Sequence, residues 1–209
     1  TPNTPVLVAE FEKNLPFSYT KGQIEVNEQI ELDLSRKFPM HRLLQGEVGS
    51  GKTVVALRAM LSVVDSAGQA ALLAPTEVLA QQHYRTINKI LGDLAMHGTL
   101  GSNEIGTQIE LLTGSLPTSK KKEIHTRLAN GEIGIVIGTH ALISEGVTFS
   151  DLGLVVVDEQ HRFGVEQRDA LKVKAKYPPH LLVMTATPIP RTVAMTVFGD
   201  LDISTLREL

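Results

Sequence analysis

The sequence predicts an α/β domain in which helices cover both faces of a mostly parallel central sheet. Short apolar stretches alternate with longer amphipathic stretches along the 209 residues, which is the pattern of repeated strand–helix units. Several apolar stretches, including 70–74 and 152–157, are continuous rather than alternating, so we expect strands that are buried on both faces. A glycine-rich loop at 46–53 stands between an apolar run and a strong helix pattern, which places it at the carboxyl end of a strand.

Turn and capping residues separate the expected elements. Residues 6–14 are weakly helical, and Thr20 can cap a helix over 23–34. Another helix pattern covers 54–64, and Gly92 and Gly131 follow the ends of two later helix patterns. We expect strands at 70–74, 109–113, 133–137, 152–157 and 180–184, helices at 77–91, 119–130, 165–176 and 190–198, and a loop at 93–108.

The composition excludes several classes of protein. With 42% hydrophobic and 21% charged residues, the chain has the balance of a globular protein with a sizeable core. It has no cysteine, which excludes disulfides and thiolate zinc sites. We find no secretory signal and no apolar run of membrane-spanning length, so we expect a cytoplasmic protein without a membrane partner. A net charge of −3 argues mildly against nucleic acid as a partner of the whole surface, but it allows a local basic groove, so the composition leaves the partner open.

Residues 46–53 read Gly-Glu-Val-Gly-Ser-Gly-Lys-Thr and match the phosphate-loop pattern G-x-x-x-x-G-K-[ST] at every fixed position. Glycines let backbone N–H groups turn toward phosphate oxygens where a side chain would collide. Lys52 would contact the outer phosphates, and the Thr53 hydroxyl would ligate Mg²⁺. The alternative is a glycine-rich surface turn, which the flanking strand and helix patterns disfavour. The predicted nucleotide-binding set is Gly46, Glu47, Val48, Gly49, Ser50, Gly51, Lys52 and Thr53.

Two adjacent carboxylates, Asp158 and Glu159, end an apolar strand at the same predicted edge as this loop. Two negative charges placed there are costly unless a cation compensates them, and a nucleotide-bound Mg²⁺ supplies that charge. Asp158 would hold the metal through water, and Glu159 would orient and deprotonate the attacking water. Without the phosphate loop, a solvated strand end would be the better interpretation.

Hydroxyl side chains follow other predicted strands. Thr185 and Thr187 close the strand at 180–184, where they could bond the carboxylates and report nucleotide state, although a threonine cap explains them nearly as well. Thr76 and Thr139 stand at further strand ends, where backbone N–H groups would suit a polyanion lying across the sheet edge. Capping alone is an equally good interpretation of these two threonines.

Basic residues outside these motifs give weaker indications. The three lysines at 120–122 lie early in a helix, where they oppose its dipole and favour an anionic partner, but a solvated face is the simpler interpretation. His83, His97, His125 and His180 lack metal-ligand spacing with acidic partners, so we expect them at the surface or in packing.

Seven segments together resemble the bacterial RecG-type DNA helicases of superfamily 2. They are LPF…T…Q, LLQGEVGSGKTVVA, APTEVLAQQH, LLTGS, GTHALI, LGLVVVDEQHRFGVEQR and MTATPIPRT…FGDLD. The resemblance runs from about residue 15 to the end and implies a RecA-like P-loop NTPase domain, the first of two motor lobes, that uses ATP and Mg²⁺. The transcription-repair coupling translocase is similar around RFGV and TATPIPRT, but its acidic motif typically reads DEEH where this chain has Gln160.

The resemblance also implies roles for single residues. Gln23 falls on the adenine-recognising glutamine of the family, with Phe17 nearby, and Glu47 stands where the family usually has aspartate. Gln160 and His161 would complete the acidic motif and couple it to the second lobe. By the same resemblance, the motif that links the lobes contains Thr185 and Thr187. The DNA-contacting motifs contain Thr76, Thr113 and Thr139.

The implied function is the ATP-binding half of an ATP-dependent helicase that remodels branched DNA, such as stalled replication forks and Holliday junctions, in DNA repair and recombination. Residues 1–14 would be a leader from a missing upstream domain, and 15–209 the ATP-binding domain. The wedge domain and the second motor lobe of the family, with its arginine fingers, do not fit in 209 residues, so we expect little activity from this lobe alone. The competing interpretations are a transcription-repair coupling lobe, a nucleotide-binding module without motor activity, and a small-molecule kinase. A kinase would need an acceptor pocket and an arginine-rich lid, which the sequence lacks.

Overall fold

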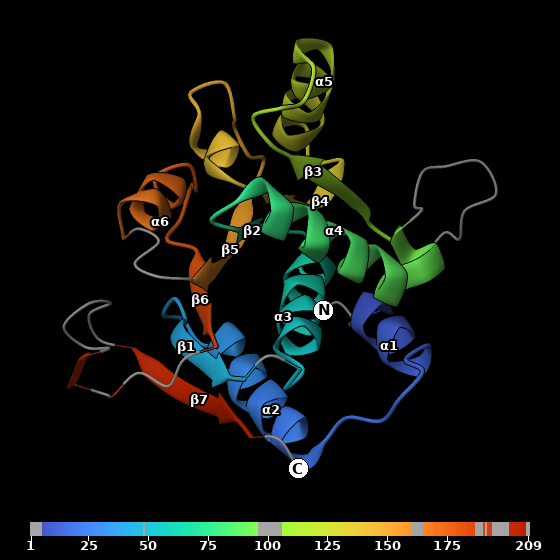
Figure 1. The fold of residues 1–209 in the computed structure, drawn as a ribbon, viewed down its shortest axis with the longest axis vertical. Helices are drawn as coiled ribbons and strands as arrows, with labels where there is room; N and C mark the ends of the chain where they lie inside the picture. The colour runs from blue at the N-terminus through green and yellow to red at the C-terminus, as the bar shows by residue number, and fades with distance from the viewer. Residues whose placement is uncertain are drawn as a thin grey trace.

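The computed structural model describes residues 6–47, 49–95, 106–159, 165–186, 190, 192–193 and 201–207, with the backbone alone at 165–168. Its described strands form one seven-stranded sheet in the order β3–β4–β2–β5–β6–β1–β7, and every neighbouring pair is parallel (Figure 1). The strands are β1 (His41–Gly46), β2 (Gln69–Leu73), β3 (Gln108–Leu112), β4 (Ile133–Gly138), β5 (Leu152–Glu159), β6 (His180–Thr185) and β7 (Asp202–Leu206). The predicted parallel sheet is confirmed.

Helices lie on both faces of this sheet, as predicted. The helices are α1 (Val6–Lys13), α2 (Lys21–Ser35), α3 (Lys52–Asp65), α4 (Glu77–Leu91), α5 (Thr118–Ala129) and α6 (Val165–Lys172), with short 3₁₀ turns at η1 (Gly92–Ala95) and η2 (His140–Ile143). One core holds α1 to α4 against the sheet, and a second holds α5, η2 and α6 against the opposite face.

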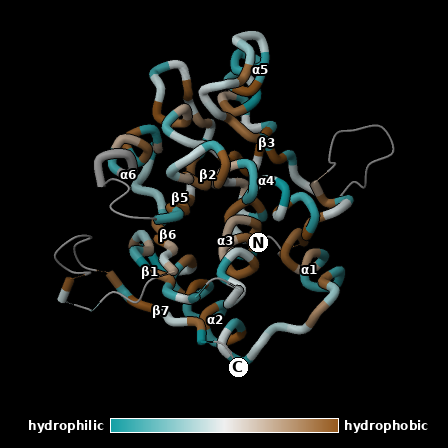
Figure 2. Tube along the Cα trace, in the orientation of Figure 1, coloured by the Kyte–Doolittle hydropathy of each residue, from teal (hydrophilic) through white to brown (hydrophobic). Residues whose placement is uncertain are grey.

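Successive residues of the strands point into different cores. Val156 of β5 is fully buried in the core under α3, whereas Val155 is fully buried in the core under α5. This alternation follows from the two-residue period of a strand, and burial on both sides explains why the strands read as continuous apolar runs. Figure 2 shows the resulting hydrophobic colour along the central strands and α3.

Most expected elements have their predicted bounds to within one or two residues. The cap at Thr20 is confirmed, because Thr20 and Gln23 form a reciprocal capping box at the start of α2. The predicted helix at 165–176 is too long: α6 ends at Lys172, and the chain continues in turns toward Pro178 and Pro179, which cannot continue a helix. The expected helix at 190–198 lies mostly outside the described residues.

β7 has no counterpart among the predicted strands. It pairs with β1 at the edge of the sheet. Arg42 of β1 stabilises the pairing: its Nε donates to Asp33 Oδ2 at 2.7 Å, and its Nη1 donates to Ser204 Oγ at 2.8 Å. The buried guanidinium thus joins α2, β1 and β7.

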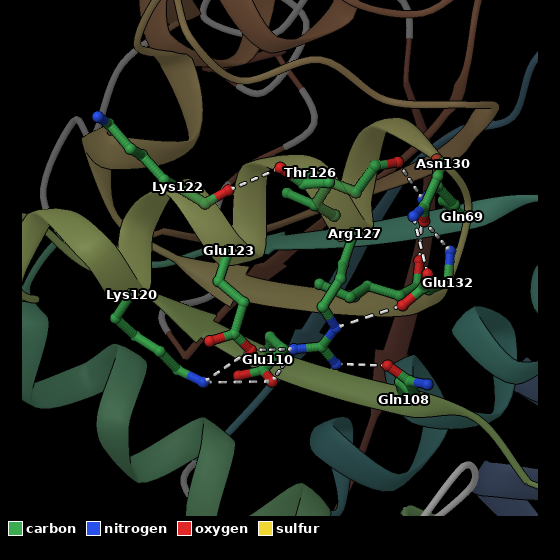
Figure 3. Close-up of polar contacts among 12 residues, drawn as sticks. Gln69, Gln108, Glu110, Lys120, Lys122, Glu123, Thr126, Arg127, Asn130 and Glu132 are labelled. Carbon is green, nitrogen blue, oxygen red and sulfur yellow. Dashed lines mark hydrogen bonds and ion pairs between the residues drawn. The ribbon is translucent and has the colours of Figure 1, made fainter.

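A second arginine covers the opposite edge of the sheet (Figure 3). Arg127 of α5 donates from Nη1 to Glu110 Oε1 of β3 at 2.6 Å, and its other nitrogens bond Gln108 and pair with Glu132. Lys120 lies 3.4 Å from Glu123 in the same network. Lys121 donates to the carbonyl of Gly114 at 2.7 Å, so the lysine run is partly engaged within the chain rather than being only a solvated face.

α1 packs into the same core as the sheet through buried Leu7, Val8 and Phe11. The backbone N–H groups of Leu7 and Val8 donate to the two carboxylate oxygens of Asp65, at the end of α3, at 2.9 and 3.0 Å. First-turn N–H groups have no partner inside their own helix, so Asp65 caps α1 from a neighbouring helix. The predicted boundary after residue 14 stays a prediction, although α1 shares this core. No helix among the described residues is long and apolar enough to cross a membrane.

Asp65→Ala should destabilise the fold by about 1–2 kcal/mol, because it removes both acceptors and a charge that favours the N-terminal end of α1. Urea unfolding followed by circular dichroism measures the change. Glu28→Ala removes an exposed carboxylate from α2 and is the control, expected within about 0.5 kcal/mol of the parent. An Asp65→Ala variant as stable as this control would show that the cap contributes nothing.

Candidate functional site

The strand order brings the predicted site residues to one edge of the sheet. β6 lies between β1, which leads into the glycine loop, and β5, which ends in Asp158 and Glu159. Glu159 is in register with Thr185 of β6, and Thr185 with Gln45 of β1. Parallel strands roughly 5 Å apart place the loop and the carboxylates about 10 Å from each other. A cleft of about 390 Å³ joins them, lined by Glu47, Gly49, Gly51, Lys52, Thr53, Leu79, Gln82, His83, Asp158, Glu159, Met184 and Ala186.

The loop has the backbone that its glycines predict. Gly49 and Gly51 have φ of 88° and 87°, a region in which a side chain is strained. A Cβ on Gly51 would also collide with the side-chain amide of Gln23, and a Cβ on Gly46 would collide with Ser50 Oγ. α3 then begins at Lys52 with no side-chain cap, so its first N–H groups have no capping acceptor at the mouth of the cleft.

The side chain of Lys52 contacts the backbone of its own loop. Its Nζ donates to the carbonyl of Gly46 and, at 3.2 Å, to the carbonyl of Glu47. Burial lowers the pKa of the Lys52 ammonium, and the nearby charge of Asp158 acts in the opposite direction. A phosphate in the cleft would offer this partly desolvated cation a charged acceptor in place of two carbonyls.

Asp158 has a partner that sequence analysis missed. Its Oδ2 lies 2.6 Å from Nε2 of His83, and the two side chains are only 19% and 14% exposed. The expectation that His83 is a surface or packing residue is therefore wrong. Its position on α4 was a usable signal, because Leu79 and His83 are four residues apart on one helix face and both line the cleft.

Gln23 lies beside the loop, and neither Gln23 nor Phe17 is among the residues that line the cleft. Gln23 is buried, its Oε1 accepts from the Thr20 N–H at 2.9 Å, and its Nε2 lies 3.4 Å from the Gly51 carbonyl. Phe17 is 45% exposed. Their adenine-recognising roles stay predictions.

The predicted threonines differ in their surroundings. Thr76 is exposed and accepts a hydrogen bond from Leu79 N at 3.2 Å, which confirms its capping interpretation. Thr139 makes no side-chain cap, and its buried hydroxyl has no hydrogen-bond partner within the described chain. Thr113 and Thr185 are buried at the ends of β3 and β6. Four further predicted residues lie outside the described residues: Val48, Gln160, His161 and Thr187.

The donors in the cleft fit a Mg²⁺ ion that arrives with a nucleotide. Thr53 supplies a hydroxyl and Asp158 a carboxylate to the same cleft, which are oxygen ligands of the kind Mg²⁺ prefers. Among the described residues no group of three or more His, Asp or Glu side chains could hold a metal by itself.

Gly51→Ala should destabilise the fold by roughly 2 kcal/mol or more, since it adds the steric contact with Gln23 to the cost of a positive φ. Gly131→Ala is the matched control, because Gly131 has φ of 86° and its Cβ would meet only Ser150, at 3.4 Å from Oγ. Thermal unfolding compares the two. Equal losses of stability in the two variants would contradict the tight contact between Gln23 and the loop. If that contact causes the loss in Gly51→Ala, adding Gln23→Ala should restore part of the lost stability.

Known proteins share the sequence and the fold of this chain. The family model described as DEAD/DEAH box helicase matches residues 21–196. The chain is 61% identical to the ATP-dependent DNA helicase RecG of Mycobacterium bovis over 205 residues, which is 97% of this chain and 28% of the relative. It is 50% identical to the RecG of Aquifex aeolicus over 198 residues, 94% of this chain and 24% of that one. The chain thus spans about a quarter of the length of these relatives.

Solved structures show the same fold. The structure of RecG bound to a three-way DNA junction superposes with a TM-score of 0.76 at 42% identity, over 97% of this chain and 25% of that one. The yeast DEAD-box splicing factor Prp28 matches with a TM-score of 0.65 at 15% identity, over 99% of this chain and 50% of that one, which shows the fold alone. The RecA-like fold and the resemblance to RecG are confirmed, and the chain belongs to the DEAD/DEAH box helicase family.

Proposed function

We propose that this chain is the ATP-binding lobe of an ATP-dependent DNA helicase that remodels branched DNA, including stalled replication forks and Holliday junctions, in DNA repair and recombination. The observation that carries the proposal is the cleft in which Lys52 and Thr53 face Asp158 and Glu159 across one sheet edge. High identity to RecG helicases and the likeness to a RecG structure with a three-way junction support branched DNA as the substrate. A cytoplasmic location stays a prediction.

The positions of Lys52, Thr53, Asp158 and Glu159 in the cleft support the roles proposed for them. The roles proposed for Gln160, His161, Gln23 and Phe17 rest on the resemblance to the helicases. The glycine loop and the start of α3 would receive the phosphates, with Lys52 exchanging its loop carbonyls for phosphate oxygens. Thr53 and Asp158 would hold Mg²⁺, which when bound neutralises charge that develops on the phosphates. Glu159 would orient the attacking water and accept its proton. Gln160 and His161 would connect this site to the second lobe, and Gln23 with Phe17 would recognise adenine.

The predicted DNA-contacting residues belong to the neighbouring part of the same edge. Thr76, Thr113 and Thr139 follow β2, β3 and β4. Because Thr113 and Thr139 are buried, we assign contact with the DNA backbone to the exposed residues beside them, Gly114 and His140.

The comparisons and the cleft also help to distinguish between the competing functions. Membership in a helicase family disfavours a small-molecule kinase. The identity of 61% to a RecG helicase supports a RecG-type lobe in preference to a transcription-repair coupling lobe. A nucleotide-binding module without motor activity would need no carboxylate to activate water, so the position of Glu159 in the cleft favours a hydrolysing enzyme.

Lys52→Ala should weaken nucleotide binding by roughly 10- to 150-fold or abolish it, since a charge-assisted hydrogen bond contributes about 1.5–3 kcal/mol. Isothermal titration with a non-hydrolysable ATP analogue and Mg²⁺ measures the change. The fold should survive, because a partly exposed loop-side lysine supports no core. Lys89→Ala, on an exposed face of α4, is the control and should bind as the parent does. Parent-like affinity in Lys52→Ala would refute the phosphate-loop assignment.

Glu159→Gln should leave ATP binding intact in the complete protein that carries this chain while lowering hydrolysis by about 10²–10⁴-fold, because it keeps the shape of the side chain and removes the base. Asp158→Asn should instead raise the Mg²⁺ concentration needed for nucleotide binding. Binding titrations at several Mg²⁺ concentrations and steady-state ATPase rates separate the two effects. An equal loss of nucleotide binding in both variants would contradict the proposed division of roles.

A further inference from the structure

α4 stands between the two parts of the proposed functional edge. It rises from β2, and the strand order places β5, β6 and β1 of the nucleotide cleft on one side of β2, and β4 and β3 of the DNA-contacting turns on the other. Its buried residues Ala80, Ile87 and Leu91 hold it in the core of the sheet. A helix of 15 residues held in this way moves as one body more readily than it bends.

The first turn of α4 holds the turn that follows β3. Glu77 Oε1 accepts a hydrogen bond from the backbone N–H of Ser115 at 3.0 Å. A Cβ on Gly114 would lie 3.8 Å from both Glu77 Oε1 and His140 Nε2, so this glycine lies between α4 and η2. Lys121 bonds the carbonyl of the same glycine at 2.7 Å. Gly114, Ser115 and His140 are exposed, as a contact for a phosphate backbone requires.

Six residues later, the same helix contacts the nucleotide cleft. His83 Nε2 lies 2.6 Å from Asp158 Oδ2, the carboxylate that we assign to Mg²⁺. At 100° per residue, Glu77 and His83 lie about 60° to either side of Ala80, so they flank the buried face of the helix. They are separated by about 9 Å along its axis. Each side of α4 therefore makes one short polar contact with a different half of the edge.

We propose that α4 couples DNA binding to the Mg-nucleotide site, with Glu77 as its positioning contact at the DNA-facing turn and His83 as its positioning contact at Asp158. This inference rests on the proposed function. A displacement of the turn at 113–115 on binding DNA reaches the first turn of α4 through the Glu77 bond. The movement of the helix then changes how His83 holds the Asp158 carboxylate, and with it the affinity for Mg-nucleotide. By linkage, bound nucleotide changes DNA affinity by the same factor.

The test measures that factor in the complete protein that carries this chain. A fluorescent non-hydrolysable ATP analogue with Mg²⁺ is titrated with and without a saturating three-way DNA junction, and the ratio of the two dissociation constants gives the coupling. Glu77→Ala and His83→Phe remove the bonding atoms, and Phe keeps the ring in place. Glu77→Gln keeps an acceptor oxygen, and His83→Gln keeps an N–H donor near the position of Nε2. Gln81→Ala changes an exposed residue of the same helix and is the control.

We expect the parent and Gln81→Ala to show coupling within the usual range of roughly 5- to 150-fold, and Glu77→Ala and His83→Phe to fall to within about twofold of unity. The two glutamine variants should keep most of the coupling. Because both contacts belong to one helix, the double variant Glu77→Ala/His83→Phe should lose no more coupling than either single variant. Circular dichroism and DNA binding without nucleotide should match the parent in every variant.

Four results would overturn the inference. Coupling of parental size in Glu77→Ala or His83→Phe would show that α4 does not carry it. Loss of binding to the junction alone or to the analogue alone in both glutamine variants would show roles in binding rather than in coupling. A parent that binds both ligands without coupling would also refute it while leaving the proposed function standing. A parent that binds neither would instead refute the proposed function, and the inference with it.

Discussion

The parallel pairing of β1, β6 and β5 is the constraint on which the proposed site depends. Parallel strands place all of their carboxyl ends at one edge, so the strand pairing itself brings the loop after β1 near the carboxylates at the end of β5. The pairing holds because the strands are buried on both faces, with Val155 and Val156 in opposite cores. The burial of apolar surface on both faces of the sheet stabilises the strand pairing, and the strand pairing in turn aligns the proposed catalytic groups.

Charge balance in the cleft is the second condition. Asp158 and Glu159 are partly buried, and they face Lys52, whose pKa burial lowers. Within the chain, Lys52 is held by loop carbonyls and Asp158 by His83. The site thus keeps both signs of charge in place by internal contacts that a Mg-nucleotide can replace. Such preorganisation reduces the reorganisation that binding requires.

Polar contacts join neighbouring elements at the edges and flanks of the domain. Arg42 joins β7 to β1 and α2 at one edge, and Arg127 joins α5 to β3 at the other. Asp65 supplies the acceptors that the first turn of α1 lacks. None of these three residues stands in a recognisable motif. The contacts that join different elements are distant in sequence: Ser204 is 162 residues from Arg42, Glu110 is 17 residues from Arg127, and Leu7 is 58 residues from Asp65. A long-range ionic contact leaves no local pattern in a sequence.

Sequence alone determined what depends on local pattern. Continuous apolar runs predict the two-sided strands, Thr20 predicts the cap of α2, and the glycines of 46–53 predict a loop whose positive φ values the structure confirms. What only the tertiary structure decided is what depends on distant pairing. The sequence did not predict β7, because a short strand at the edge of a sheet needs burial on fewer sides and so need not be a continuous apolar run. The spacing of Leu79 and His83 indicates a shared helix face, but it does not identify the partner of His83, because Asp158 is 75 residues away along the chain and comes within 2.6 Å only when β2 and β5 pair side by side.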